Sequence, residues 1–76
     1  MTTKLINLQP GKEAVVLKIE GGMGIKRKLQ AMGIYVGNQI KVIQSLSRGP
    51  IIIESGNTRL AIGRGMAEKI EVQINE

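Results

Sequence analysis

The stretch that decides the fold is residues 21–37, GGMGIKRKLQAMGIYVG. Within it Ile25, Leu29 and Met32 fall at i, i+4 and i+7, a spacing that places them on one face of an α-helix. The glycines at the start of the stretch separate this helix from what precedes it. We therefore predict one short helix with an apolar inner face, and we expect Leu29 to belong to the core.

The end of this helix is marked by Gly33 and Ile34. A helix commonly ends in a residue with left-handed backbone, and glycine adopts that conformation at low cost because it has no Cβ. A hydrophobic residue directly after it often closes the end by contacting the last turn. The pair predicts that the helix stops at position 33 and that Ile34 packs against it.

The outer face of the predicted helix carries Lys26, Arg27 and Lys28. We expect these cations in the first turn, where positive charge opposes the helix dipole by typically about 0.3–1 kcal/mol. Such a run is either a solvated face or a contact patch. Our hypothesis is that these three residues meet acidic groups of a partner, with Tyr35 as an amphipathic anchor, since tyrosine is enriched at interaction hot spots.

The rest of the chain predicts short strands separated by turns. We expect strands over residues 13–20, 37–46, 51–54, 59–62 and 70–74, and a helical turn over residues 63–68. Alternation predicts the inward faces of the first two strands, which are Val15, Leu17 and Ile19 in one and Ile40, Val42 and Leu46 in the other. Five short strands at this spacing predict a mainly β, closed or nearly closed barrel, with the helix after the first strand and the helical turn before the last.

Composition narrows the function. The chain has 76 residues, which we take as one domain over residues 1–76, with no cysteine and no histidine. Thiol chemistry is therefore excluded, and the commonest general base and transition-metal ligand are absent. No pairing suggests a nucleophile with its base, and the glutamates form no cluster, so we predict no catalytic residues, no metal ligands and no cofactor. The short apolar runs predict no membrane span.

The net charge of +5 leaves three partner classes open besides simple solubility. Basic excess favours acidic protein faces, an anionic membrane surface or nucleic acid. Small β-barrels bind single strands by stacking bases on aromatic side chains, and Tyr35 is the only aromatic residue here. A basic barrel that binds RNA or a ribosomal partner is therefore the second interpretation, and we expect no specific nucleic-acid binding.

Five short motifs resemble the FeoA family of proteins associated with bacterial ferrous iron uptake. They are Leu5-x-x-Leu8-x-x-Gly11, Lys28-Leu29-x-x-Met32-Gly33-Ile34-x-x-Gly37, Gly49-Pro50-Ile51, Leu60-Ala61-Ile62 and Ala67-x-x-Ile70-x-Val72. The second is the most specific, and the others follow barrel patterning. The pattern is also similar to the C-terminal domain of some iron-dependent repressors.

The resemblance implies an SH3-like barrel in the cytoplasm. It further implies a non-enzymatic role through contact with FeoB, a membrane transporter that carries a cytosolic GTP-binding domain. Transition-metal binding enters only through this family association, because the sequence shows no iron ligands. The sequence does not indicate an oligomeric state.

Overall fold

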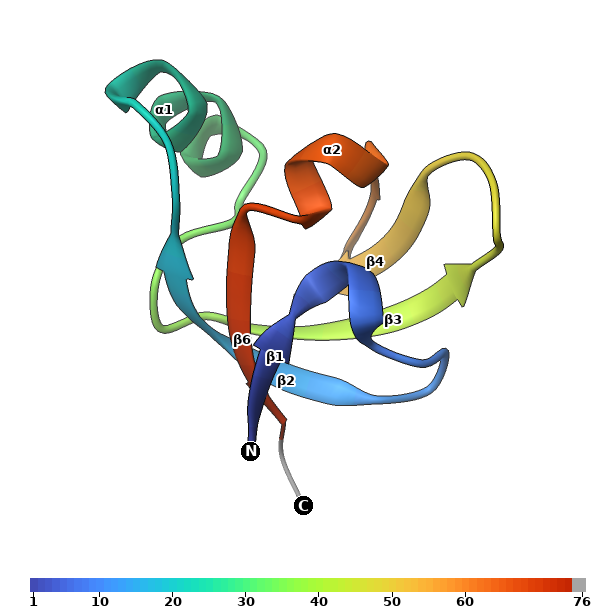
Figure 1. Cartoon of the computed structure of the whole chain (residues 1–76). Helices are drawn as coiled ribbons and strands as arrows, with labels where there is room; N and C mark the ends of the chain where they lie inside the picture. The colour runs from blue at the N-terminus through green and yellow to red at the C-terminus, as the bar shows by residue number, and fades with distance from the viewer. Residues whose placement is uncertain (75–76) are drawn as a thin grey trace.

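A computed structural model describes residues 1–74 (Figure 1). Its elements follow in the order β1 (Thr2–Lys4), the 3-10 turn η1 (Leu5–Asn7), β2 (Glu13–Ile19), α1 (Met23–Ala31), β3 (Gln39–Ser45), β4 (Ile51–Ser55), β5 (Thr58–Ile62), α2 (Arg64–Ala67) and β6 (Ile70–Ile74). The helix, the helical turn and the five predicted strands are therefore confirmed, with ends that differ by a few residues.

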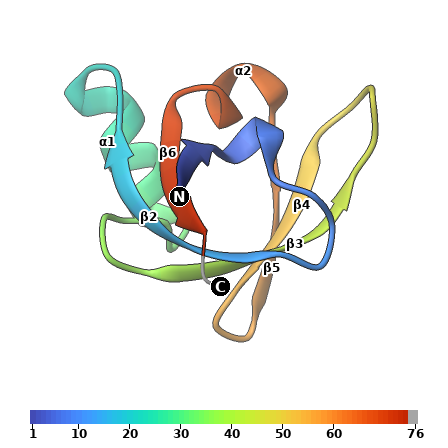
Figure 2. The ribbon, with the colours of Figure 1, turned by 60° about the horizontal axis from the view of Figure 1, so that its bottom comes forward.

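The strands form one curved antiparallel sheet in the order β1-β6-β2-β3-β4-β5. The predicted barrel is wrong in its number of strands, because the sheet has six rather than five. Of the two predicted forms, closed or nearly closed, the fully closed one is not formed. No pairing joins its edge strands, β1 and β5, within residues 1–74. Instead η1 follows β1, α2 follows β5, and these two short turns lie together between the sheet edges (Figure 2).

The strand that the sequence analysis missed is β1. It has three residues, all polar, so it carries neither the length nor the apolar alternation that predicts a strand. It forms because β6 offers it a partner edge, with Thr3 opposite Val72, and the Ile74 amide donates to the Met1 carbonyl at 2.9 Å. The helix therefore follows the second strand of the chain, not the first.

The inward face of β2 also differs from the prediction. Ala14 and Val16 are buried together with Ile19, whereas Val15 and Leu17 are only half-buried. The pairing of β2 with β6 shifts register between Val16 and Lys18. Such a β-bulge inserts one residue and reverses the alternation beyond it. Simple alternation counted back from Ile19 therefore selected the wrong residues in the first half of the strand.

A similar irregularity affects β3. Ile40 and Val42 are buried as predicted, but Leu46 is 59% exposed. The pairing of β3 with β4 shifts register between Val42 and Gln44, and the strand ends at Ser45. The apolar alternation therefore does not continue to Leu46, which lies in the loop between β3 and β4.

The end of α1 matches the predicted cap. Gly33 has φ +93°, its amide donates to the Gln30 carbonyl at 3.0 Å, and the Ile34 amide donates to the Leu29 carbonyl at 2.8 Å. This hydrogen-bond pair is the Schellman arrangement, in which the two residues flanking the turn also pack together. Leu29 and Ile34 are both fully buried, so the cap attaches the helix to the core.

We predict that Leu29→Ala lowers the free energy of unfolding by about 2–5 kcal/mol, because a well-packed core leucine leaves a cavity when truncated. A domain of this size has a total stability of about 5 kcal/mol, so the loss is large enough to unfold the variant at moderate temperature. Thermal and urea unfolding would measure the loss. Gln30→Ala, at the exposed next position, is the control. An unchanged melting temperature for Leu29→Ala would contradict its place in the core.

Two glycines of this segment should respond oppositely to alanine. Gly33 has open space around it but a positive φ, so Gly33→Ala should cost about 1–2 kcal/mol in backbone strain. Gly24 lies inside α1 with open space and no positive φ, so Gly24→Ala should stabilise the protein by up to about 1 kcal/mol. Urea unfolding of both variants checks the pair, and equal effects would argue against the cap.

Candidate partner-binding groove beside α1

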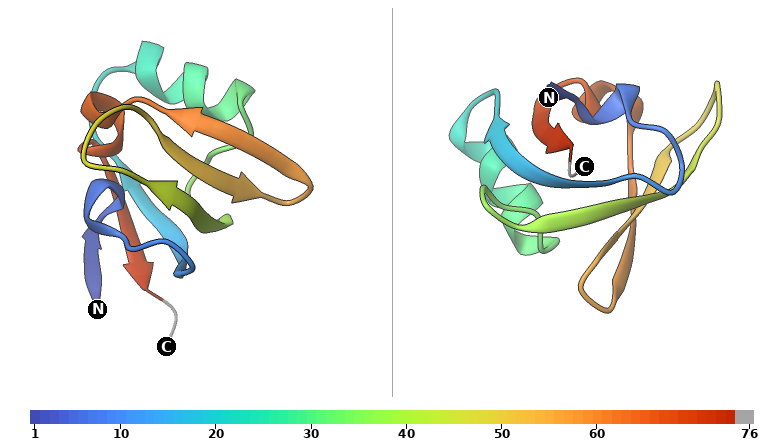
Figure 3. Two further views of the ribbon diagram at one scale, coloured as in Figure 1. Left: turned by 90° about the vertical axis from the view of Figure 1, so that its right-hand side faces the viewer. Right: turned by 90° about the horizontal axis from the view of Figure 1, so that it is seen from below.

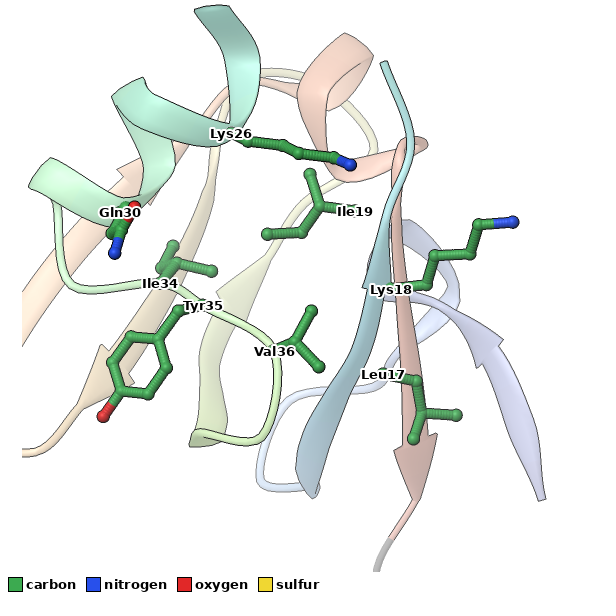
Figure 4. A pocket seen from close by; sticks show the side chains of 8 residues that line it. All are labelled: Leu17, Lys18, Ile19, Lys26, Gln30, Ile34, Tyr35 and Val36. Carbon is green, nitrogen blue, oxygen red and sulfur yellow. The ribbon is translucent and has the colours of Figure 1, made fainter. Parts of the chain in front are cut away.

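A groove of about 290 Å³ lies between α1 and β2 (Figure 4). Its residues come from three places, the second half of β2, one face of α1 and the loop after the helix. They are Leu17, Lys18, Ile19, Lys26, Gln30, Ile34, Tyr35 and Val36. The Schellman end of α1 places the loop opposite the strand, so the cap that fixes the helix also forms one wall of the groove.

The apolar side chains of the groove are Ile19, Ile34 and Val36, which point into the space between α1 and β2 (Figure 4). In the same view the side chains of Leu17 and Lys18 point away from that space, on the other side of β2. These two residues therefore border the groove mainly through their main chain.

The main chain of β2 is paired on both sides only in its first half. Glu13–Val15 face β3, and Val16 continues this side by accepting from the Gly37 amide at 2.7 Å and donating to the Asn38 carbonyl at 3.0 Å. Beyond Val16 the loop turns away toward α1. In the described chain, Lys18 and Ile19 then have a strand partner only in β6, and Leu17 is the extra residue of the bulge, with no strand partner. The groove lies along their other side.

The loop wall is held in place by Asn38, which is 9% exposed. Its Oδ1 accepts from the Tyr35 amide at 3.0 Å, and its Nδ2 donates to Ser55 Oγ at 2.8 Å. Ser55 Oγ in turn donates to the Gly33 carbonyl at 3.3 Å. This network joins the loop wall of the groove to β4.

The residues predicted to contact a partner are only partly brought together. Lys26 and Tyr35 both line the groove, and Lys26 extends from α1 toward β2 above Ile19 (Figure 4). Tyr35 is 53% exposed, with its hydroxyl pointing outward. Arg27 and Lys28 are exposed on α1 but do not line the groove.

One argument for the basic cluster is wrong. The helix begins at Met23, so Lys26 already lies beyond the first three helical positions, and Lys28 lies in the last turn. Positive charge in the last turn is favourable to the helix dipole. The dipole therefore gives no reason to regard this placement as selected for contact.

Three features of the groove were not predicted from the sequence. They are the half-paired edge of β2, the lining residue Val36 and the supporting residue Asn38. The spacing of the strands in the sequence does not indicate where the pairing of β2 with β3 ends. The apolar pair of Ile34 and Val36 around Tyr35 does indicate a surface-facing loop with an apolar lining, and could have been recognised.

Residues 1–74 contain no group of three or more His, Cys, Asp or Glu side chains that could hold a metal ion. They also contain no helix long and apolar enough to cross a membrane.

Comparison with known proteins identifies the family. The model of the FeoA domain matches residues 3–74. This chain belongs to the FeoA family. A Methanocaldococcus jannaschii protein, provisionally named Fe(2+) transport protein A, is 44% identical over 63 residues, which are 83% of this chain and 76% of that protein. A crystal structure of an iron uptake regulatory protein (FeoA) superposes with a TM-score of 0.95 at 39% identity, covering 99% of this chain and all of the other.

A manganese-dependent transcriptional repressor shares the fold. It superposes with a TM-score of 0.89 at 18% identity, over 97% of this chain and 42% of the repressor. At this identity the likeness concerns the fold alone. The fold is thus SH3-like and mainly β, as the family resemblance implied, although its sheet is open.

We predict that Asn38→Ala lowers the free energy of unfolding by about 1–3 kcal/mol, because it leaves the Tyr35 amide and Ser55 Oγ without their partner. Hydrogen exchange at the Tyr35 amide should accelerate. A general loss of stability would accelerate exchange throughout the protein, whereas this variant should affect the loop most. Asn57→Ala, in the exposed turn after β4, is the control and should change stability by less than about 0.5 kcal/mol. Unaltered exchange at Tyr35 would show that Asn38 does not hold the loop.

Proposed function

We propose that this protein is a non-enzymatic cytosolic accessory of ferrous iron uptake, acting by contact with the membrane GTP-binding transporter FeoB. The observation that carries the proposal is membership of the FeoA family over residues 3–74. The name of the Methanocaldococcus jannaschii relative, which refers to Fe(2+) transport, supports it. The FeoB partner follows from the family association.

A role through contact agrees with the chemistry of the groove. Its ionisable side chains are Lys18, Lys26 and Tyr35, and none of them is hydrogen-bonded to a nucleophile or a second acid–base group among the described residues. General acid–base and nucleophilic catalysis both need such pairs. Apolar side chains beside exposed cations are instead typical of a binding surface.

We place the contact surface on the exposed side of α1 and the following loop. Lys26, Arg27 and Lys28 would meet acidic groups of the transporter, and Tyr35 would supply an amphipathic anchor. Cations at the rim of an interface mainly raise the association rate and the salt dependence, whereas a central aromatic side chain mainly slows dissociation.

The test is a triple change of Lys26, Arg27 and Lys28 to glutamine, with folding checked by circular dichroism. Binding to the cytosolic part of the transporter would be measured at low and moderate salt. We expect a slower association rate and a weaker salt dependence. Tyr35→Ala should mainly raise the dissociation rate, with an affinity loss of at least about 1 kcal/mol.

The matched control changes Lys4, Lys12 and Arg48 to glutamine, which removes the same charge from exposed positions outside α1. Wild-type affinity and salt dependence in the α1 variant, with a loss in this control, would move the contact surface elsewhere. Sub-micromolar, sequence-selective RNA binding at physiological salt would instead favour the nucleic-acid interpretation over transport.

A further inference from the structure

We infer that the groove beside α1 receives an extended acidic segment of the partner, which adds as a β-strand to the half-paired edge of β2. The inference rests on the proposed function for the identity of the partner, the cytosolic part of the transporter. It specifies that the contact surface binds the backbone and the alternate side chains of an extended segment, rather than the surface of a folded domain.

The first argument is the strand edge. Lys18 and Ile19 pair with β6 on one side, and Leu17 is the extra residue of the bulge. None of the three has a strand partner on the other side within residues 1–74. An unpaired edge presents main-chain donors and acceptors that a further chain can use. Peptide recognition by strand addition draws its affinity from these main-chain hydrogen bonds. The main chain of Leu17 and Lys18 borders the groove, with their side chains directed away from it (Figure 4).

The second argument is the apolar lining. Ile19, Ile34 and Val36 point into the groove. Ile19 and Ile34 are 6% and 0% exposed and form its closed base, whereas Val36 is 61% exposed and supplies the accessible apolar surface. Side chains of a strand alternate between its two faces. Every second side chain of an added strand would therefore point into this lining, which selects apolar residues at alternate positions.

The third argument is charge. None of the residues that line the groove is acidic, and Lys26 extends across it toward β2 (Figure 4). Arg27 and Lys28 are exposed on the adjacent surface of α1. The one ion pair of the described chain, Arg59 with Glu54, lies in β4 and β5 and does not involve these cations. The remaining side chains of the added strand are therefore expected to be carboxylates.

The fourth argument is size. A volume of about 290 Å³ lies just below the roughly 300–1,000 Å³ typical of ligand pockets. The groove is thus suited to a few residues of extended chain. Single-stranded nucleic acid fits it less well, because bases need aromatic platforms and only Tyr35 is present.

The probe for the test is an acetylated, amidated hexapeptide of alternating glutamate and valine. Hydrogen exchange of the backbone amides would be measured by NMR with and without it. At a peptide concentration ten times the Kd, the amides of residues 17–19 that do not bond β6 should exchange about tenfold more slowly, in proportion to the bound fraction. Docking through side chains alone would leave these amides unprotected.

Two N-methylated peptides provide the matched pair. In a strand, alternate amides point to opposite sides, so methylation of one alternate set removes the hydrogen bonds to β2 and methylation of the other does not. One peptide should lose binding and the other should keep it. Equal behaviour of the two peptides would overturn strand addition.

Two protein variants test the lining. Val36→Ser should weaken peptide binding by roughly tenfold, since it removes apolar contact within the groove. Leu46→Ser is the control, because Leu46 is exposed to almost the same extent, 59% against 61%, but lies in the loop between β3 and β4. An equal response of the two variants would place the peptide outside the groove.

The outcomes for the peptide and for the transporter can be told apart. Binding of the transporter domain without protection of residues 17–19 would overturn the strand and leave the proposed function standing. Strand addition by the peptide, with no binding of the transporter domain, would support the groove and remove the transporter as its partner. Protection of these amides by both would support the whole inference.

Discussion

The hydrogen bond from the Ile34 amide to the Leu29 carbonyl, across the left-handed Gly33, sets the direction of the chain as it leaves α1. It returns the main chain toward the sheet within two residues, so that Leu29 and Ile34 are buried together. Isolated helices of nine residues are marginal in water, so α1 depends on packing against the core for its stability. The reversal of the chain at Gly33 provides part of that packing.

The same reversal explains why a groove exists. The chain needs residues 35–37 to travel from the helix end to β3, and Gly37 then meets β2 at Val16. The segment that leads into β3 can therefore pair with β2 only at Val16 and the residues before it. The second half of β2 is left between β6 on one side and the helix on the other. The groove is thus a geometric consequence of inserting a helix between two strands that pair.

The central helix and most strands were predictable because their patterns are local. The i, i+4, i+7 spacing ending at Gly33 needs no knowledge of the rest of the molecule. The errors arise where pairing decides the outcome. β1 depends on an edge of β6, and the inward face of β2 depends on a bulge opposite β6. For the site, Lys26 and Tyr35 were found as exposed residues of one segment, but the edge of β2 that faces them comes from tertiary arrangement.

One further consequence follows from the pairing of β1 with β6. The Met1 carbonyl and the Ile74 amide are hydrogen-bonded, so the two ends of the described fold leave the sheet together, at the end of the molecule opposite α1 (Figure 3). Neighbouring termini favour circular permutation and insertion into a host chain. This unit is therefore suited to be carried as a module on a larger polypeptide, with the tether on one pole and the helix with its groove presented on the other.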